Sequence, residues 1–369
     1  MSALAAQAHA QAQAMPGPEG ISAFVRMQGR LEALAGAFGL GGQAAMIDTY
    51  RAIFRHALDF PEGAPPGASR LSEDGTPIQF ATTLGRAQPA LRFVGDPAPP
   101  GASGAVRMST AHAALAEVAV TLGLAPELAA IAPLLAELAP QTARALLEDP
   151  AGSLWIGAAF TPGAAPILRI YLNGSWGTKA AVKARLATFA AYFGQAAAWG
   201  RAESLMPTAL HPIGLALTLG PGRPVRGAIY LRAFGLRLAD YTALANFIAG
   251  PANAALIDRF GTALLGPDSL HPTPSAVFSM GFSQASRPSA ELEFCTHCLY
   301  RDDAEAQRHL LALFANAGLD PAPYHAFLRH LASPSRPGPP HLHAFIGVDA
   351  KASNPAYTLY MKPDLSARR

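Results

Sequence analysis

The chain has 369 residues, enough for two domains or one large domain with a sizeable core. Charged residues make up 14% of it and the net charge is +3, which argues against a nucleic-acid-binding tract. Half of the residues are hydrophobic, but no run is long and apolar enough to span a bilayer, so no membrane partner is expected.

The N-terminal segment, residues 1–20, is rich in Ala and Gln and is predicted to be disordered. It lacks the basic start and leucine-rich middle of a secretory signal, so a cytoplasmic protein is expected. Abundant Ala, Gly and Pro, with Arg in preference to Lys, are typical of a GC-rich bacterial source.

Further along, stretches of helical periodicity alternate with pairs of short β-type runs that are separated by Gly- or Pro-containing turns. This unit recurs roughly every 60 to 75 residues, five times in all. The predicted helical segments are 21–57, 110–147, 178–203, 238–265 and 302–331. The predicted strand pairs are 76–84 with 89–95, 153–160 with 166–173, 211–219 with 224–232, 275–284 with 289–297, and 341–349 with 355–361.

Ten antiparallel strands would leave two exposed edges unless the sheet closes. One face of these strands is apolar, and the other carries Arg, Tyr, Gln, Thr and Glu. We therefore predict an α+β fold with a closed ten-stranded antiparallel barrel, a polar and aromatic lumen, and an outer ring of helices. A single domain over residues 21–363 and a tail over 364–369 are expected. A parallel α/β sheet is disfavoured, because the turns within the pairs are too short for crossover helices.

Arginine and tyrosine share strand faces in two of the predicted hairpins. Arg169 and Tyr171 are two residues apart, and Arg226 and Tyr230 are four apart, so each pair points to the same side of its strand. If these faces converge inside the barrel, they form a pocket suited to an anion and to a reactive cation.

This ordered pattern resembles the aromatic prenyltransferases of the dimethylallyltryptophan synthase type, the bacterial indole prenyltransferases in particular. The resemblance covers residues 21–363. It implies the prenyltransferase barrel, or ABBA fold, and an enzyme of secondary metabolism. That enzyme would transfer a dimethylallyl or longer prenyl group from an allylic diphosphate to an electron-rich aromatic acceptor, foremost an indole or tryptophan-derived molecule.

The resemblance implies four basic residues that hold the diphosphate: Arg92, Arg169, Arg226 and Lys351. Arginine suits this group because its fork binds two anionic oxygens at once. Where the family usually has a lysine after Arg226, this chain has Ala228, so donor affinity is expected to fall unless another group compensates.

Four aromatic residues fall where the family shields the allyl cation: Tyr171, Tyr230, Tyr360, and Phe345 at a usual tyrosine position. Their π faces would stabilise positive charge and exclude water.

The family's acidic residue that grips the acceptor's ring N–H falls on Gln79, in the segment 73–80. An amide oxygen accepts a hydrogen bond weakly and is no base near neutrality. The expected acceptor is therefore an indole held less tightly, an indole prenylated at an unusual atom, or a phenol or other ring that prefers an amide partner. Glu291 or Glu293 could face the lumen, but the register of the fourth hairpin stays open, and a slip of one residue exchanges the two faces.

No cofactor is expected to be required. The chain has no Asp-Asp-x-x-Asp motif, and Asp302-Asp303 reads as a helix start, so no metal is implied for the chemistry. The expected partners are a small aromatic acceptor and a prenyl diphosphate, and the protein is expected to be a monomer or a homodimer.

The two cysteines, Cys295 and Cys298, are too few for a disulfide framework. With His341 and His343 they could form a zinc set, but on an extended chain residues three apart face opposite ways, which disfavours it. His297 is expected to be exposed or satisfied within the core. The altered positions 79 and 228 leave open a non-catalytic barrel that binds an apolar or anionic small molecule.

Overall fold

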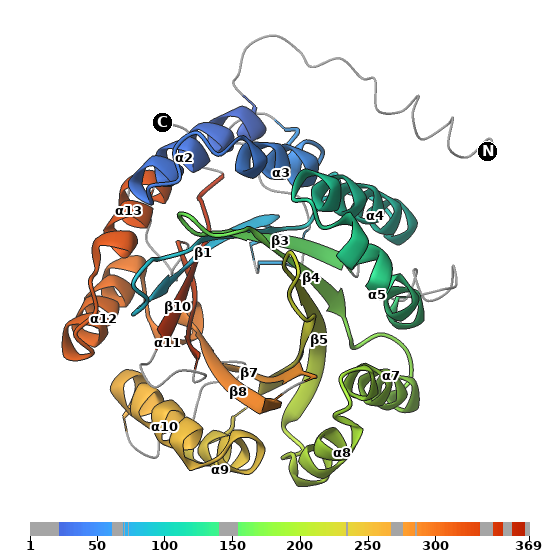
Figure 1. Cartoon of the computed structure of the whole chain (residues 1–369). Coiled ribbons are helices and arrows are strands. Elements are labelled where there is room, and N and C mark those ends of the chain that lie inside the picture. The colour runs from blue at the N-terminus through green and yellow to red at the C-terminus, as the bar shows by residue number, and fades with distance from the viewer. Residues whose placement is uncertain are drawn as a thin grey trace.

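The protein forms a closed antiparallel β-barrel that is encircled by helices (Figure 1). The computed structural model describes residues 22–60, 69, 71–72, 74–139, 154–233, 235–266, 276–284, 286–332, 342–349 and 356–365. Every described strand belongs to the one sheet, which confirms the predicted fold class. The predicted disorder of residues 1–20 lies outside the described residues, and the single domain over 21–363 stays a prediction.

Each strand pairs with its neighbours in sequence, and β1 closes the barrel against β10. All five predicted hairpins are present. The strands are β1 (Ile78–Leu84), β2 (Leu91–Gly95), β3 (Leu154–Phe160), β4 (Ile167–Asn173), β5 (Leu210–Leu219), β6 (Arg226–Ala233), β7 (Ala276–Ser283), β8 (Ser286–Cys295), β9 (His343–Asp349) and β10 (Ala356–Met361).

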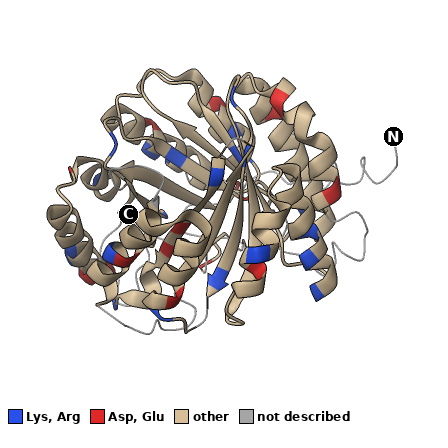
Figure 2. Ribbon diagram, turned by 60° about the horizontal axis from the view of Figure 1, so that its bottom comes forward, with Lys and Arg blue, Asp and Glu red and all other residues tan. Residues whose placement is uncertain are grey.

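Helices lie between successive hairpins and cover the outside of the sheet (Figure 1). They are α2 (Ala23–Ala37), α3 (Ala44–Phe54), α4 (Gly104–Thr121), α5 (Ala125–Leu138), α7 (Lys179–Tyr192), α8 (Ala196–Leu205), α9 (Leu238–Ala249), α10 (Pro251–Leu265), α11 (Thr296–Leu299), α12 (Asp303–Asn316) and α13 (Ala322–Leu331). Of the helices in the described part of the chain, none is long and apolar enough to cross a membrane. Basic and acidic residues are interspersed over the helices (Figure 2).

The sequence sets where these helices begin and break. Four of them start after a residue whose side-chain oxygen accepts a backbone N–H, namely Ser22, Ser103, Thr178 and Asp302. Such a cap contributes about 1 kcal/mol. The predicted helix over 21–57 is in fact two helices, because glycines with positive φ interrupt it after α2.

The barrel is apolar outside and polar inside, as predicted. Outward residues such as Ile170, Leu217 and Leu292 are fully buried beneath the helices. Aromatic rings fill much of this layer: Phe54 of α3 meets Phe93 of β2 with ring centroids 6.1 Å apart. Burying one such side chain stabilises the fold by about 1.5–3 kcal/mol, so the core lies between sheet and helices and leaves the lumen free for a ligand.

Gly227 of β6 packs directly against two aromatic rings, those of Phe189 on α7 and of Phe193, which follows α7. A Cβ at this position would lie 2.3 Å from Phe193 Cε2 and 2.7 Å from Phe189 Cζ. We expect Gly227→Ala to destabilise the protein by about 1–3 kcal/mol, measured by urea unfolding, because the packed rings must shift. The control is Gly36→Ala on the exposed side of α2, where nothing lies within 4 Å. Removing glycine from a helix should leave stability unchanged or raise it by up to about 1 kcal/mol. Equal effects of the two changes would contradict the packing argument.

Candidate functional site

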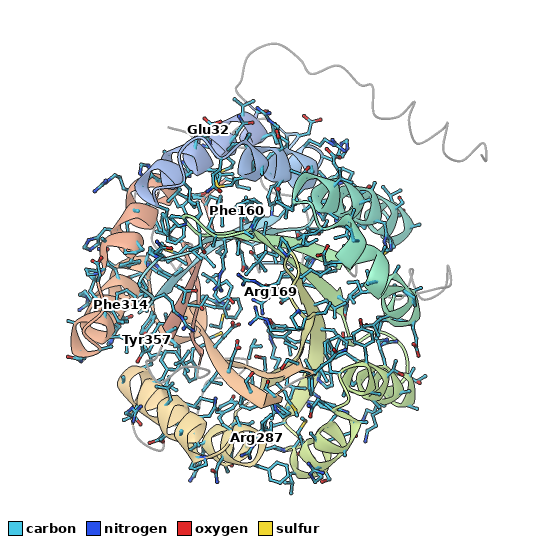
Figure 3. The ribbon with its side chains drawn as sticks, in the orientation of Figure 1. Glu32, Phe160, Arg169, Arg287, Phe314 and Tyr357 are labelled. Carbon is cyan, nitrogen blue, oxygen red and sulfur yellow. The ribbon has the colours of Figure 1, made fainter. Side chains whose placement is uncertain are left out.

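A cavity of about 680 Å³ occupies the end of the lumen where the hairpin turns lie. Its wall is built by side chains from β1 to β8 and from β10. Its volume lies within the usual range for sites that bury a small molecule. In Figure 3, Arg169 lies near the middle of the barrel, at the level of this cavity.

Three of the four predicted diphosphate ligands line the cavity: Arg92, Arg169 and Arg226. Lys351 lies outside the described residues. Between Arg92 on β2 and Arg169 on β4, strand β3 offers only Ala159 and Gly157 at the paired positions. Because these side chains are small or absent, the space between the two guanidinium groups is open rather than filled by side chains from β3.

Arg169 is held among aromatic rings. Its Nη2 donates a hydrogen bond to the Tyr230 hydroxyl at 3.0 Å, and its Cζ lies 5.4 Å from the centre of the Tyr171 ring. The two tyrosine rings are themselves 6.2 Å apart. Burial raises the pKa of Tyr230, so its hydroxyl stays neutral beside the guanidinium. The predicted Arg and Tyr faces of β4 and β6 therefore do converge.

A second aromatic pair faces the lumen from β9 and β10. Phe345 and Tyr360 are paired in register, and their rings meet edge to face with centroids 6.3 Å apart. Tyr360 also lines the cavity. All four residues predicted to shield a cation thus lie on the lumen face.

Gln79 lies on the lumen face of β1, lines the cavity and is only 4% exposed. Its amide nitrogen donates to the Leu71 carbonyl and to Ser72 Oγ, both at 2.9 Å. With both amide hydrogens engaged, the oxygen is the polar atom that Gln79 can offer to a ligand.

The structure fixes the register of the fourth hairpin: Glu291 and Glu293 both face the lumen. Glu291 lines the cavity, and Glu293 follows two residues further along β8. Tyr360 donates its hydroxyl to Glu293 Oε1 at 2.9 Å. Gly347 on β9 makes this possible, because a Cβ there would fall 2.6 Å from Glu293 Cγ.

Burial raises the pKa of Glu293 to about 7, and the charge of Glu291 acts in the same direction. The Tyr360 hydrogen bond and the charges of Arg169 and Arg92 act against this shift. A carboxyl group whose raised pKa lies near neutrality therefore faces the lumen next to the cavity-lining Tyr360. Burial likewise raises the pKa of Tyr360, which keeps its proton.

Two arginines at the mouth of the cavity, Arg86 and Arg287, were not predicted from the sequence. Arg287 is fixed by bonds to the carbonyls of Ile248 and Phe247 at the end of α9, at 2.9 and 3.1 Å. Arg86 lies in the turn between β1 and β2, where strand alternation gives no signal. The altered position, Ala228, also lines the cavity, opposite Ala216 and Gly281.

The interpretation that Cys295 and Cys298 face opposite ways is wrong. Strand β8 ends at Cys295 and α11 begins at the next residue, so the chain turns and brings both sulfurs to one side. The imidazole of His343 is not part of this group. Its Nδ1 bonds to Asp303 Oδ1 at 2.7 Å and its Nε2 to the Tyr324 hydroxyl at 2.8 Å, while His341 lies outside the described residues.

Known structures share this barrel, although no family model and no curated protein matches the chain by sequence. The 6-dimethylallyltryptophan synthase from Micromonospora olivasterospora, solved with DMASPP and Trp, is 20% identical with a TM-score of 0.78, covering 94% of this chain and 99% of its own. The 5-dimethylallyltryptophan synthase from Streptomyces coelicolor is 22% identical with a TM-score of 0.78, covering 95% and 100%.

The chain has the fold of the dimethylallyltryptophan synthases. The prenyltransferase PriB, solved with L-tryptophan and dimethylallyl thiolodiphosphate, gives the same result, with 22% identity, a TM-score of 0.78, and 95% and 98% of the two chains covered. AnaPT from Neosartorya fischeri is more distant, at 12% identity and a TM-score of 0.68. The closed barrel predicted from the hairpin pattern, and the prenyltransferase-barrel fold that the resemblance implied, are therefore confirmed.

Proposed function

We propose that this protein is an aromatic prenyltransferase. It transfers a dimethylallyl or longer prenyl group from an allylic diphosphate to an indole or tryptophan-derived acceptor, in bacterial secondary metabolism in the cytoplasm. The observation that carries the proposal is the lumen cavity, where Arg92, Arg169 and Arg226 adjoin the aromatic rings of a dimethylallyltryptophan synthase fold. Neighbours with this fold were solved with tryptophan and a dimethylallyl donor analogue.

The arginines hold the donor by its diphosphate. Charge-assisted hydrogen bonds from Arg92, Arg169 and Arg226 stabilise the negative charge that develops as the allylic C–O bond breaks, and Lys351 adds a fourth cation. Because the three arginines are part of the wall, the reaction is proposed to need no metal ion and no other cofactor.

The aromatic residues protect the allyl cation. Tyr171 and Tyr230 on one side, and Phe345 and Tyr360 on the other, present π faces to positive charge and keep out the water that would quench it. Gln79 positions the acceptor by accepting its ring N–H at the amide oxygen, whereas the same amide cannot take a proton.

The proton released by the acceptor leaves through Tyr360 and Glu293. As the new C–C bond forms, the ring proton passes to the Tyr360 oxygen, and the hydroxyl proton passes along the existing 2.9 Å hydrogen bond to Glu293. The displaced diphosphate carries away the electrons of the broken C–O bond. Glu293 is suited to this role because it titrates near neutrality.

The decisive test incubates the full chain with dimethylallyl diphosphate, or a longer homologue, and a panel of indoles, tryptophan derivatives, indole-containing dipeptides and phenols. EDTA is present throughout. A prenylated product and released diphosphate are expected. Donor binding without any turnover would instead favour a non-catalytic binding barrel. This is the second candidate, because Gln79 and Ala228 stand where the family usually has an acidic residue and a lysine. Absence of both binding and product would overturn the proposal.

Arg226 is expected to contribute to donor binding from the cavity mouth, where it is exposed at the start of β6. Arg226→Ala should weaken binding of a non-reacting donor analogue about 10-fold, measured by calorimetry, since an exposed charge-assisted bond is worth about 1.5 kcal/mol. The matched control is Arg223→Ala in the adjoining turn, which lines no part of the cavity. It should leave binding unchanged. A larger loss at Arg223 would show that this arginine compensates for Ala228.

A further inference from the structure

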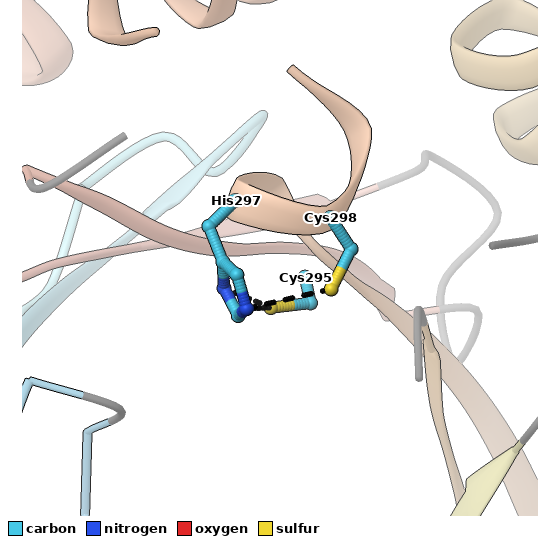
Figure 4. Close-up of side chains that lie close together, drawn as sticks. All are labelled: Cys295, His297 and Cys298. Atoms are coloured by element: carbon cyan, nitrogen blue, oxygen red, sulfur yellow. Dashed lines mark hydrogen bonds between the residues drawn. The ribbon is translucent and has the colours of Figure 1, made fainter. Parts of the chain in front are cut away.

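Two thiols and an imidazole meet at the end of the barrel opposite the hairpin turns (Figure 4). Cys295 is the last residue of β8, and His297 and Cys298 belong to α11. The Cys295 sulfur lies 2.7 Å from His297 Nδ1 and 3.8 Å from Nε2, and the Cys298 sulfur lies 3.4 Å from Nε2. The ligand atoms of the three residues all lie within 4.8 Å of one another.

The backbone holds this cluster in place. Thr296, between the first cysteine and the histidine, is fully buried, and its hydroxyl contacts the carbonyls of His343 and Ala344 on β9 at 2.6 and 3.0 Å. The helical turn closes with the Tyr300 N–H on the Thr296 carbonyl at 3.0 Å. Residues three apart in a helical turn share a face, so both sulfurs are presented to the imidazole by anchored backbone.

The spacing fits a tetrahedral zinc ion. With Zn–S of about 2.3 Å and Zn–N of about 2.0–2.1 Å, a sulfur and a nitrogen bound to one zinc lie about 3.6 Å apart. The two distances from His297 Nε2, 3.8 and 3.4 Å, lie on either side of this value. The shorter contact to Nδ1 is a hydrogen bond, which ligation through Nε2 would lengthen. Two thiolates and one imidazole are ligands that zinc prefers.

We propose that Cys295, His297 and Cys298 bind a zinc ion, with a fourth position left for water or another ligand. The ion ties the end of β8 to α11 and so stabilises this end of the barrel. It takes no part in prenyl transfer. Cys295 lies four residues beyond the cavity-lining Glu291 along β8, roughly 13 Å from that residue, and two strands away from Tyr360, which also lines the cavity. Zinc replaces the two thiol protons, so its affinity rises with pH.

The test titrates the reduced full-length protein first with cobalt and then with zinc. Cobalt bound to thiolates gives an intense sulfur-to-metal absorption, which reports the ligands directly in the unmutated protein. One equivalent of cobalt should produce this absorption, and one equivalent of zinc should abolish it. Zinc should also raise the melting temperature. No thiolate-to-cobalt absorption, or a disulfide between the two cysteines as the only stable state of the pair, would overturn the proposal.

Variants complete the test. Cys298→Ser and His297→Ala should each bind zinc more than about 100-fold more weakly. Loss of a residue that hydrogen-bonds a metal ligand already lowers metal affinity by about 10- to 100-fold, and loss of the ligand itself should lower it further. The control is His112→Ala on the exposed side of α4. Circular dichroism shows whether each variant is folded. Equal zinc affinity in Cys298→Ser and the unmutated protein would refute the site, and prenyl transfer, assayed separately, should continue in zinc-depleted enzyme.

Discussion

Glu293→Gln is expected to lower kcat for prenyl transfer by about 100-fold at a pH of about 8, the smaller end of what a positioned proton acceptor supplies. The amide preserves the size of the side chain and can still accept the Tyr360 hydroxyl, but it cannot hold a proton. Donor binding should be unchanged, because the loss falls on a step after the diphosphate is bound. Single-turnover rates, compared with calorimetric binding of a donor analogue, separate the two.

The pH dependence gives a second measurement of the same group. Below its raised pKa of about 7, Glu293 is protonated and cannot accept, so kcat should rise with pH through this value and then level off. Glu293→Gln should remove this acid limb. Glu291→Gln should keep the limb but move it to lower pH, because it removes a neighbouring negative charge that raises the Glu293 pKa.

A double-mutant cycle tests whether the proton passes through Tyr360. Tyr360→Phe keeps the aromatic ring that faces the cation and loses only the hydroxyl that bonds Glu293. It should reduce kcat about as much as Glu293→Gln, and the double variant should lose little more, because both changes interrupt one path. Fully additive losses, or an unchanged acid limb in Glu293→Gln, would refute the relay.

The fold could be predicted from the sequence because its signal is repeated along most of the chain. The sequence of a strand such as β4 distinguishes its two faces. Leu168, Ile170 and Leu172 point outward, and Arg169 and Tyr171 point inward. Five such hairpins with short turns leave closure as the simplest way to remove the sheet edges. The same alternation placed Arg169 with Tyr171, and Arg226 with Tyr230, on one face of their strands, whereas the assignments of Arg92, Phe345 and Tyr360 came from the family resemblance.

The alternation of side chains between the two faces no longer predicts their direction where the chain stops being a regular strand. A register irregularity between Gly281 and Ser283, and a β8 that begins at Ser286, left the faces of the fourth hairpin unpredictable. At Cys295 the strand ends one residue before a helix, and the assumption of an extended chain gave the wrong side for Cys298. Arg86 lies in a turn, where position along the chain does not predict which way a side chain points. Each miss therefore has a local backbone cause.

Arg169→Gln is expected to lower kcat/KM for prenyl transfer by about 10²–10³-fold, the largest effect among the described arginines. This guanidinium lies inside the lumen between two tyrosines, where charge interactions are screened less than at the exposed Arg226. The same charge therefore stabilises the departing diphosphate more strongly. Steady-state kinetics and analogue binding should show losses in both kcat and affinity.

Two further variants separate charge from geometry. Arg169→Lys retains the charge but not the planar fork, so it cannot bond the Tyr230 hydroxyl and two diphosphate oxygens in the same arrangement, and only part of the activity should return. Tyr230→Phe keeps the Arg169 cation and the aromatic ring beside it. It removes only the 3.0 Å hydrogen bond that orients the guanidinium, which should lower kcat/KM about 10-fold. If Arg169→Gln instead reduced kcat/KM no more than Arg226→Ala does, an arginine deep in the lumen would stabilise the departing diphosphate no better than one at the mouth. The diphosphate would then be held at the cavity mouth by Arg86, Arg226 and Arg287.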